Sequence, residues 1–396
     1  MRSRWRWAPG IVVASMLCTA CSDAADVDAG GEDASVALEG GPEDDALYPG
    51  EEWETGAPED HGIDPTRLQE AADTAEGHDS HCFMVIQGGK VVGEWYWDGW
   101  DRDTRQDVFS ATKSFTSTLV GIAQDRGLLG IDDRASDTIT QWQGTDSEDV
   151  TVRNLLSNDS GREWALTTDY VGMATLAADK TRFAVELGQD HEPGTWWEYN
   201  NSAIQTLEAV LEQATDMEVG DFAREVLFEP LGMGAEYTLD DAGNATTFGG
   251  MQASCDDLAR LGYLFLRNGR WAGEQIVSRT WVEEATVPST ELNSAYGYLW
   301  WLNRDGHWVE PTGSSRSEGD GKWHPGDPQE VFMALGFQGQ IAFVDPTRDL
   351  VYARIGGMGD STAAFLGGAT GDLSSLAGGP EVTDIRDAVR AALIDE

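Results

Sequence analysis

The chain has 396 residues, which is enough for one large domain or two of ordinary size. Hydrophobic residues make up 40% of it and aromatic residues 9%, so most of the chain can fold around a packed core. The formal net charge of −44 argues against nucleic acid as a partner, because such a protein cannot neutralise phosphates.

Residues 1–20 have the pattern of a signal peptide. Basic residues precede a short apolar run, Ala8 to Leu17, which is too short to span a bilayer as a permanent helix. The small residues before Cys21 resemble a bacterial lipobox, in which this cysteine is acylated and becomes the mature N-terminus. The leucine usual at the third position before it is Cys18 here, so plain secretion stays open beside lipidation. We expect an exported lipoprotein of a bacterial cell envelope, in contact with the membrane through its lipid alone, or otherwise a secreted protein.

Residues 21–59 are predicted to form a disordered acidic tether. The stretch from residue 22 to residue 60 contains fourteen acidic residues and no lysine or arginine. Such a stretch repels itself and has too few apolar groups to offset the entropy lost on ordering. One folded domain, residues 60–396, is predicted to follow it.

Cleavage before Cys21 leaves Cys82 and Cys255 in the folded part. Export permits a disulfide, but free buried cysteines are also common, so the sequence leaves open whether this pair is joined. No CxxC pair follows the signal, and the six histidines are scattered, with only His78 and His81 close together. We therefore expect no metal and no cofactor.

The folded part opens with a helix and a hairpin. Asp64 followed by Pro65 is a helix start, and it leads into a helix over Leu68 to Ala75. Two runs of strand-forming residues, Cys82 to Ile86 and Val91 to Trp97, flank a glycine turn. Together they predict an antiparallel hairpin.

Helices dominate the middle of the chain, and strands return near its end. The stretch from Pro311 to Pro328 is rich in Gly, Ser and charge, which indicates a long insertion loop. These elements predict an α/β (α+β) fold, with an antiparallel sheet built from both chain ends, flanked by helices, and a mostly helical inserted region. The predicted helices are Ser114–Gln124, Ser202–Ala214, Asp256–Leu266 and Asp384–Leu393, and the predicted strands are Gln340–Val344 and Leu350–Ile355.

Ser110 and Lys113 are the first residues that indicate a chemistry. A serine hydroxyl is a poor nucleophile until a neighbour takes its proton. Because positions three apart share a helix face, Lys113 can place its amine beside the Ser110 oxygen. A helix start also directs free N–H groups and the positive end of the dipole at this point. Alone, the pattern equally fits a capping serine and a solvated lysine.

Tyr199 and Asn201 form a second pattern, Tyr-x-Asn, which follows a Pro-Gly turn and precedes a helical run. A tyrosine beside a lysine can share the proton of a serine, and an asparagine amide can hold a substrate carbonyl. In isolation the same residues fit a loop with a packed tyrosine.

Together these patterns resemble the penicillin-recognising serine hydrolases, the superfamily of class C β-lactamases, DD-peptidases and related esterases. That family has Ser-x-x-Lys at the opening of a helix, then Tyr-x-Asn, then a triplet like Lys-Thr-Gly on a late strand. The stretches Leu155–Gly161 and Gly249–Met251 also resemble segments of the family. The resemblance covers roughly residues 60 to 395 and implies a β-lactamase/transpeptidase-like fold.

The third motif departs from the common form. The strand carries the triplet Ala334–Gly336, so the glycine is kept, but an alanine replaces the cation or histidine that starts the triplet in the family. With the following Phe337–Gln340, the segment is similar to the branch containing 6-aminohexanoate-oligomer hydrolases and carboxylesterases. The glycine lets a backbone approach the substrate closely. The resemblance implies an oxyanion hole made by the N–H groups of Ser110 and Phe337.

The resemblance also implies a role for the other matched residues. Ser110 attacks an ester or amide carbonyl, and Lys113 and Tyr199 move its proton as one coupled base, with either open as the acceptor. Asp169 and Tyr170 fit a surface loop as well as a substrate contact. The expected substrate-binding residues are Asn201, Gly336, Asp169 and Tyr170; Trp196, Trp197, Trp300 and Trp301 fit the cleft, but core packing is their expected role.

We predict a secreted serine hydrolase that cleaves small-molecule esters or linear amides and has little β-lactam activity. Ala334 cannot bind a substrate carboxylate, and the negative net charge does not attract anions. Arg316 or Lys322 from the insertion loop stay open as replacement cations. The alternatives are a DD-peptidase or β-lactamase of the cell envelope, or a non-catalytic envelope-binding relative. The intact serine, lysine and tyrosine disfavour the last.

Overall fold

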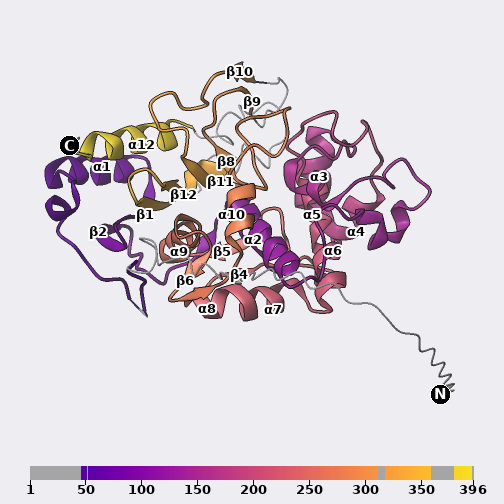
Figure 1. The fold of residues 1–396 in the computed structure, drawn as a ribbon, viewed down its shortest axis with the longest axis horizontal. Coiled ribbons are helices and arrows are strands. Elements are labelled where there is room, and N and C mark those ends of the chain that lie inside the picture. Colours follow the sequence, from indigo (N-terminus) through magenta and orange to yellow (C-terminus); the bar gives the residue numbers. More distant parts are fainter. Residues whose placement is uncertain (1–45, 51, 311–316, 358–378, 395–396) are drawn as a thin grey trace, which may run out of the picture. The chain divides into compact units, whose positions relative to one another are not determined.

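The computed structural model describes residues 46–50, 52–310, 317–357 and 379–394. At its centre is a six-stranded antiparallel sheet with strand order β2-β1-β13-β12-β11-β8 (Figure 1). Both ends of the chain contribute to it, because the N-terminal β1 pairs with the C-terminal β13. This confirms the predicted architecture. The strands are β1 (Ser80–Gln87), β2 (Lys90–Tyr96), β8 (Trp301–Leu302), β11 (Phe332–Gly336), β12 (Gln340–Asp345) and β13 (Leu350–Gly356).

Helices cover the sheet, which explains why its central strands are apolar almost throughout. All residues of β12 and β13 are buried, as expected of strands whose two faces are both covered. Helix α9 (Cys255–Leu266) packs on both of these strands, and α1 (Pro65–Gly77) packs on β1 and on α12 (Pro380–Ala392). Figure 1 shows α1 and α12 side by side, away from α9.

Several helix starts are set by side-chain caps. The carboxylate of Asp64 accepts hydrogen bonds from the N–H groups of Thr66 and Arg67 and begins α1, as the sequence predicts. Ser254 and Asp257 form a reciprocal capping box that begins α9.

The middle of the chain is mostly helical, as predicted, but the helix expected over Ser202–Ala214 is two helices. These are α5 (Asn201–Gln205) and α6 (Leu207–Thr215), and they meet at Thr206. The Thr206 hydroxyl donates to the carbonyl of Ala203, which competes with continuous helix geometry. The other elements of this region are α3 (Val152–Ser157), the π-helical η6 (Thr167–Leu176), α4 (Lys180–Glu186), α7 (Val219–Ala223), the π-helical η7 (Arg224–Phe228) and α8 (Glu229–Leu231).

A second, small sheet has three strands. It has the order β3-β5-β4 and is antiparallel throughout. Its strands are β3 (Gln106–Asp107), β4 (Glu236–Tyr237) and β5 (Met251–Ala253). Strand β3 leads directly into α2 (Thr112–Asp125), the helix predicted over Ser114–Gln124.

Two sequence predictions require correction. Part of the predicted tether contacts the folded body: Trp53 is buried and its indole N–H donates to Asp256 at 2.6 Å, and the Leu47 carbonyl accepts a hydrogen bond from the Tyr263 hydroxyl at 2.5 Å. The tether prediction failed here because it weighed acidic composition over individual aromatic side chains. The insertion predicted over Pro311–Pro328 is not loop throughout, because β10 (Glu318–Asp320) pairs with β9 (His307–Val309). Residues 1–45, which include the predicted signal peptide and Cys21, lie outside the described residues.

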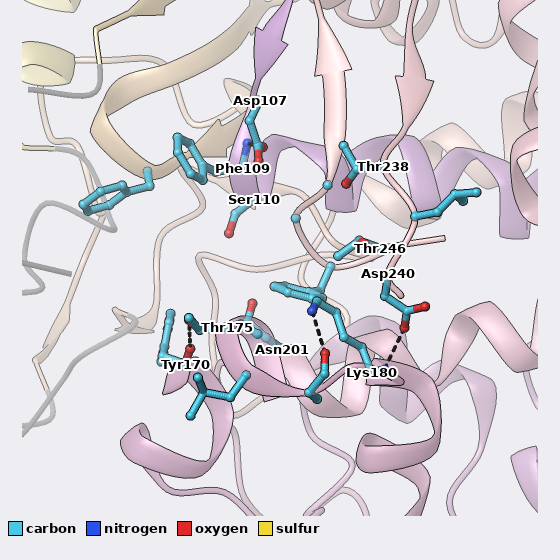
Figure 2. Close-up of a pocket in the computed structure, with 18 of the residues that line it drawn as sticks. Asp107, Phe109, Ser110, Tyr170, Thr175, Lys180, Asn201, Thr238, Asp240 and Thr246 are labelled. Atoms are coloured by element: carbon cyan, nitrogen blue, oxygen red, sulfur yellow. Dashed lines mark hydrogen bonds between the residues drawn. The ribbon is translucent and has the colours of Figure 1, made fainter. Parts of the chain in front are cut away.

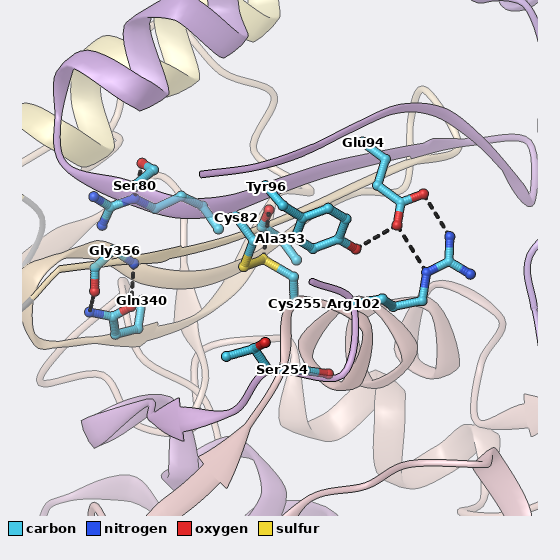
Figure 3. Close-up of a disulfide and its surroundings, with 12 residues drawn as sticks. Ser80, Cys82, Glu94, Tyr96, Arg102, Ser254, Cys255, Gln340, Ala353 and Gly356 are labelled. Carbon is cyan, nitrogen blue, oxygen red and sulfur yellow. Dashed lines mark hydrogen bonds and ion pairs between the residues drawn. A yellow bond between two sulfur atoms is a disulfide. The ribbon is translucent and has the colours of Figure 1, made fainter. Parts of the chain in front are cut away.

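Cys82 and Cys255 form a disulfide. This answers the question of their pairing, which the sequence left open. Their Cα atoms are 6.3 Å apart, and 173 positions separate them in the chain. The bond joins β1 to the first residue of α9 (Figure 3). It therefore links the helix on the sheet to one of the strands beneath it.

Among the described helices, none combines the length and apolarity needed to cross a membrane.

Candidate active site

Ser110 lies in a tight turn between β3 and α2. The preceding residue, Phe109, has a φ of 48°, in the left-handed region that non-glycine residues rarely adopt. The carboxylate of Asp107 accepts a hydrogen bond from the Phe109 N–H at 2.7 Å, which stabilises this turn. Burial raises the pKa of Asp107 to about 6. The turn presents the Ser110 side chain to a cavity of about 390 Å³ (Figure 2).

Lys113 lies one helical turn after Ser110 and is almost fully buried. Its Nζ atom is 2.9 Å from Ser110 Oγ, 2.7 Å from Asn201 Oδ1 and 2.6 Å from the carbonyl oxygen of Phe248. Burial lowers the pKa of Lys113 to about 7, although the carboxylate of Asp169 acts in the opposite direction. A large fraction of this amine is therefore neutral at physiological pH.

Asp169 sets the orientation of Asn201. Its carboxylate is buried and accepts hydrogen bonds from Asn201 Nδ2 at 2.8 Å and from the Ser202 N–H and hydroxyl at 2.7 and 2.6 Å. Because a carboxylate only accepts, it must face the amide nitrogen of Asn201, and this turns Oδ1 toward Lys113. The structure thus places Asp169 beneath the site, and not on the surface loop that its sequence context also allowed.

Tyr199 completes the group around the nucleophile. Its ring centroid is 4.7 Å from the Nζ of Lys113, and an interaction with the Ser110 side chain partly lowers the pKa of its phenol. The ring stacks on Trp301 with centroids 5.8 Å apart. Burial raises the pKa of Tyr199 far above its usual range, with a further contribution from Asp169. The phenol is therefore protonated at neutral pH.

Gly336 and Phe337 lie against the turn that carries Ser110. A Cβ atom on Gly336 would lie 2.1 Å from the carbonyl oxygen of Val108 and 3.2 Å from the N of Ala111. The glycine is therefore needed for two backbones of the protein to pack together, not for substrate to approach that position. The Phe337 ring packs edge-on against Phe109 with centroids 5.6 Å apart. This brings the backbone after β11 beside the nucleophile.

Some of the predicted site residues line the cavity, and others do not. Ser110, Asn201, Tyr170 and Phe337 line it, whereas Asp169 and Gly336 lie behind its wall. Figure 2 shows Ser110 facing the cavity from one side and Tyr170 and Asn201 from the other. Both polar atoms of the Asn201 amide are engaged by Lys113 and Asp169. In this conformation Asn201 holds the lysine instead of a substrate carbonyl.

The other residues singled out from the sequence lie away from the cavity. Ala334 is fully buried within β11, opposite Ala342 of β12. Lys322 donates to the carbonyl of Asp327 at 2.5 Å and does not line the cavity, and Arg316 lies outside the described residues. The tryptophans behave as expected of core residues, with Trp196 the exception: Trp197, Trp300 and Trp301 are buried, and Trp196 is exposed.

Two contacts of the site carried no sequence signal strong enough to find them. The Phe248 carbonyl oxygen binds Lys113, although the family-like segment Gly249–Met251 begins only after Phe248. Asp107 stabilises the turn before Ser110 through one backbone N–H. A backbone carbonyl is present at every position, so nothing in the sequence distinguishes the one at Phe248.

Within the described residues, no cluster of three or more His, Cys, Asp or Glu side chains could hold a metal ion.

Comparison with known proteins assigns the chain to a family. Residues 69–355 match the sequence profile of the family described as Beta-lactamase. The chain is 24% identical over 310 residues to the 6-aminohexanoate-dimer hydrolase of Paenarthrobacter ureafaciens, covering 73% of this chain and 76% of that protein.

Two examples illustrate the solved structures that share this fold. One is a family VIII carboxylesterase, with a TM-score of 0.59, 17% identity, and coverage of 84% of this chain and 99% of the other. The second is a penicillin-binding protein homologue from Caulobacter crescentus, with a TM-score of 0.60, 17% identity, and coverage of 84% and 99%. At these identities the likeness shows the fold alone.

Proposed function

The chain belongs to the beta-lactamase family of serine hydrolases, and from this premise we propose that it hydrolyses neutral esters and linear amides through an acyl-enzyme on Ser110. The observation that carries the proposal is the 2.9 Å contact between Ser110 Oγ and the buried amine of Lys113, whose pKa burial lowers to about 7. A nucleophile paired with a base of this kind supports acyl transfer.

The contacts of Lys113 favour it over Tyr199 as the base. A neutral amine has two N–H donors and one lone pair. Asn201 Oδ1 and the Phe248 carbonyl oxygen only accept, so they take the two N–H groups. The lone pair is then left to receive the proton of Ser110. The Tyr199 phenol is protonated and can donate a hydrogen bond or a proton instead.

The reaction follows from these assignments. Ser110 Oγ attacks the substrate carbonyl carbon while its proton passes to Lys113, and the carbonyl oxygen gains the negative charge. The N–H groups of Ser110 and Phe337 stabilise that oxygen; one such donor contributes roughly 3–4 kcal/mol in other acyl-transfer enzymes. Collapse of the intermediate expels the alcohol or amine, which takes a proton from the Lys113–Tyr199 pair. A water molecule then attacks the acyl carbonyl carbon while its proton passes to the Lys113–Tyr199 pair. Ser110 Oγ leaves as the acid product forms and takes that proton back.

Neutral substrates are favoured by the charges around the cavity. Its described lining includes the carboxylates of Asp107, Asp240 and Asp241 against one ammonium, that of Lys180. Ala334 offers no cation on the strand beside the nucleophile. A substrate carboxylate would lose its hydration without gaining a charged partner, at a cost on the order of 1–3 kcal/mol or more. Penicillins and peptides ending in a free carboxylate are therefore disfavoured.

The decisive experiment compares kcat/KM on two neutral substrates, short-chain p-nitrophenyl esters and the corresponding p-nitroanilides, with kcat/KM on nitrocefin and a D-Ala-D-Ala peptide. We expect the esters or the linear amide to be preferred, and a tenfold or greater preference for nitrocefin would reject the substrate class. Labelling by a fluorophosphonate probe, lost in Ser110→Ala, separates an enzyme from a non-catalytic binding relative. Circular dichroism of Ser110→Ala should match wild type, because a small, partly exposed hydroxyl contributes little to packing.

We further propose that the protein is exported and anchored through an acylated Cys21. The Cys82–Cys255 disulfide supports an oxidising compartment, where such bonds persist. The full-length protein expressed in a bacterium should partition into detergent, and Cys21→Ser should release it or stall its processing. Recovery of the wild type as a soluble protein with a different N-terminus would show simple secretion instead.

A further inference from the structure

Leu176 and Leu239 are the two most exposed large apolar side chains among the described residues. They are 72% and 63% exposed, and both line the cavity that contains Ser110. They come from separate segments, since Leu176 ends η6 and Leu239 follows β4. A single exposed leucine is ordinary. Two that gather on one catalytic cavity indicate a place where an apolar group binds.

The two leucine-bearing segments are held together by hydrogen bonds. The N–H of Lys180 donates to the Asp240 carboxylate at 2.7 Å, and the N–H of Ala242 donates to the carbonyl of Ala178 at 3.0 Å. These contacts join the chain just after Leu176 to the turn just after Leu239. The pair is therefore preorganised, and little ordering entropy remains to be lost when a ligand covers it.

The charges nearby restrict what that ligand can be. The cavity lining carries the carboxylates of Asp107, Asp240 and Asp241. The one lysine of this lining is Lys180, and its ammonium group donates a hydrogen bond to the carbonyl oxygen of Ala177 at 3.0 Å. An anionic group would meet mostly like charges here, whereas a neutral hydrocarbon chain gains by covering the leucines.

We propose that Leu176 and Leu239 form an apolar subsite that binds a linear alkyl chain of the substrate. This rests on the proposed function, because it assigns the chain to the ester or amide that Ser110 cleaves. The preferred substrates then carry an extended hydrocarbon chain on the acyl side or on the leaving-group side, and covering the two leucines makes binding stronger as that chain lengthens.

Two substrate series test the subsite, p-nitrophenyl alkanoates from acetate to decanoate and alkyl acetates from ethyl to decyl. In one series kcat/KM should rise by roughly two- to fourfold per methylene group until the chain passes the leucines. The series that rises identifies the side of the scissile bond. Flat profiles in both series would overturn the proposal.

Substitution of the leucines should flatten that rise. In the Leu176→Ser/Leu239→Ser double variant, the ratio of octyl to two-carbon kcat/KM should fall at least tenfold. The matched control is Leu128→Ser, which changes a side chain that is 43% exposed and not part of the cavity lining. An unchanged ratio in the double variant, or an equal fall in the control, would reject the subsite.

A binding measurement separates failure of the subsite from failure of the catalytic proposal. Titration calorimetry of octanamide into Ser110→Ala measures occupancy without hydrolysis. We expect binding that weakens at least tenfold when both leucines are also changed to serine. If wild type neither turns over esters nor labels with fluorophosphonate, yet octanamide binds in this way, the subsite stands and the catalytic proposal fails. If turnover and labelling occur but octanamide does not bind, the subsite alone is rejected.

Discussion

At the scale of single residues, burial determines the charge of Lys113. Its amine is surrounded by neutral acceptors, Asn201 Oδ1 and the Phe248 carbonyl oxygen, and by the face of the Tyr199 ring. Such groups stabilise an ammonium less than water does, so the pKa falls to about 7. The carboxylate of Asp169 limits the fall without abolishing it.

The first prediction is a pH dependence of kcat/KM. Because the active form of Lys113 is the neutral amine and burial has lowered its pKa to about 7, activity should rise with pH through that value and level off above it. Below the pKa the decline approaches tenfold per pH unit. The rate of fluorophosphonate labelling at limiting probe should follow the same curve. A profile that is flat from pH 6 to 8 while the protein stays folded would contradict the assignment.

The second prediction concerns Asp169→Asn. The new amide nitrogen would face the donors of Asn201 and Ser202, so we expect a loss of roughly 1–3 kcal/mol in unfolding free energy and at least tenfold in kcat. Removing the charge that raises the pKa of Lys113 should also shift the rising limb of the pH profile to lower pH. Asp73→Asn on an exposed position of α1 is the control. A limb that does not move would show that Asp169 acts on structure alone.

At the scale of secondary-structure elements, the site depends on how closely β11 approaches the start of α2. No side chain separates them, because Gly336 lies against the backbone of Val108 and Ala111. The same approach packs Phe337 against Phe109, next to the turn that carries Ser110. One missing Cβ thus controls the geometry between two elements.

The third prediction follows from that contact. In Gly336→Ala the added Cβ cannot be accommodated at 2.1 Å from the Val108 oxygen, so β11 must move away from the nucleophile. We expect probe labelling to slow at least tenfold and the melting temperature to fall. Gly220→Ala in α7 is a matched control, since its Cβ would meet no atom within 4 Å and alanine favours helix. Wild-type labelling by Gly336→Ala would show that the approach is not required.

At the scale of the whole molecule, contacts between distant segments hold the domain together. The Cys82–Cys255 bond connects an N-terminal strand to a helix 173 positions later, and β1 pairs with β13. Segments far apart in sequence are costly to bring together, because each closed loop loses chain entropy. A covalent link across so long a loop lowers the entropy of the unfolded chain considerably.

The fourth prediction is that Cys82→Ala/Cys255→Ala lowers the unfolding free energy by about 2–5 kcal/mol. Neither cysteine lines the cavity, so kcat on a short ester should stay within about twofold of wild type at temperatures where the variant is folded. Urea denaturation with and without reductant provides the measurement, and reductant should destabilise only the wild type. Equal stability of the two proteins would show that the bond forms without constraining the unfolded chain.

Much of the fold was predictable because local patterns and tertiary packing agree. The hairpin, the late strand pair and the helices α1, α9 and α12 all follow apolar spacing, turn residues or caps that act within a few positions. The predictions failed where distant contacts override composition. The acidic stretch around Trp53 is ordered because that side chain packs on α9. The break of the predicted single helix at Thr206 has a local cause instead, the hydrogen bond from its hydroxyl to the carbonyl of Ala203.

For the site, the sequence by itself determined the types and order of the chemical groups: the serine and lysine one helical turn apart, then the Tyr-x-Asn motif, then the glycine on a late strand. Spacing along a helix is a local property, so it can be recognised without a fold. Only the tertiary structure decided that Asn201 faces Lys113, that Asp169 lies beneath them, and that two exposed leucines share the cavity with Ser110. Those relations depend on burial and on contacts between segments dozens of residues apart, and a residue's type does not reveal which distant segment it will meet.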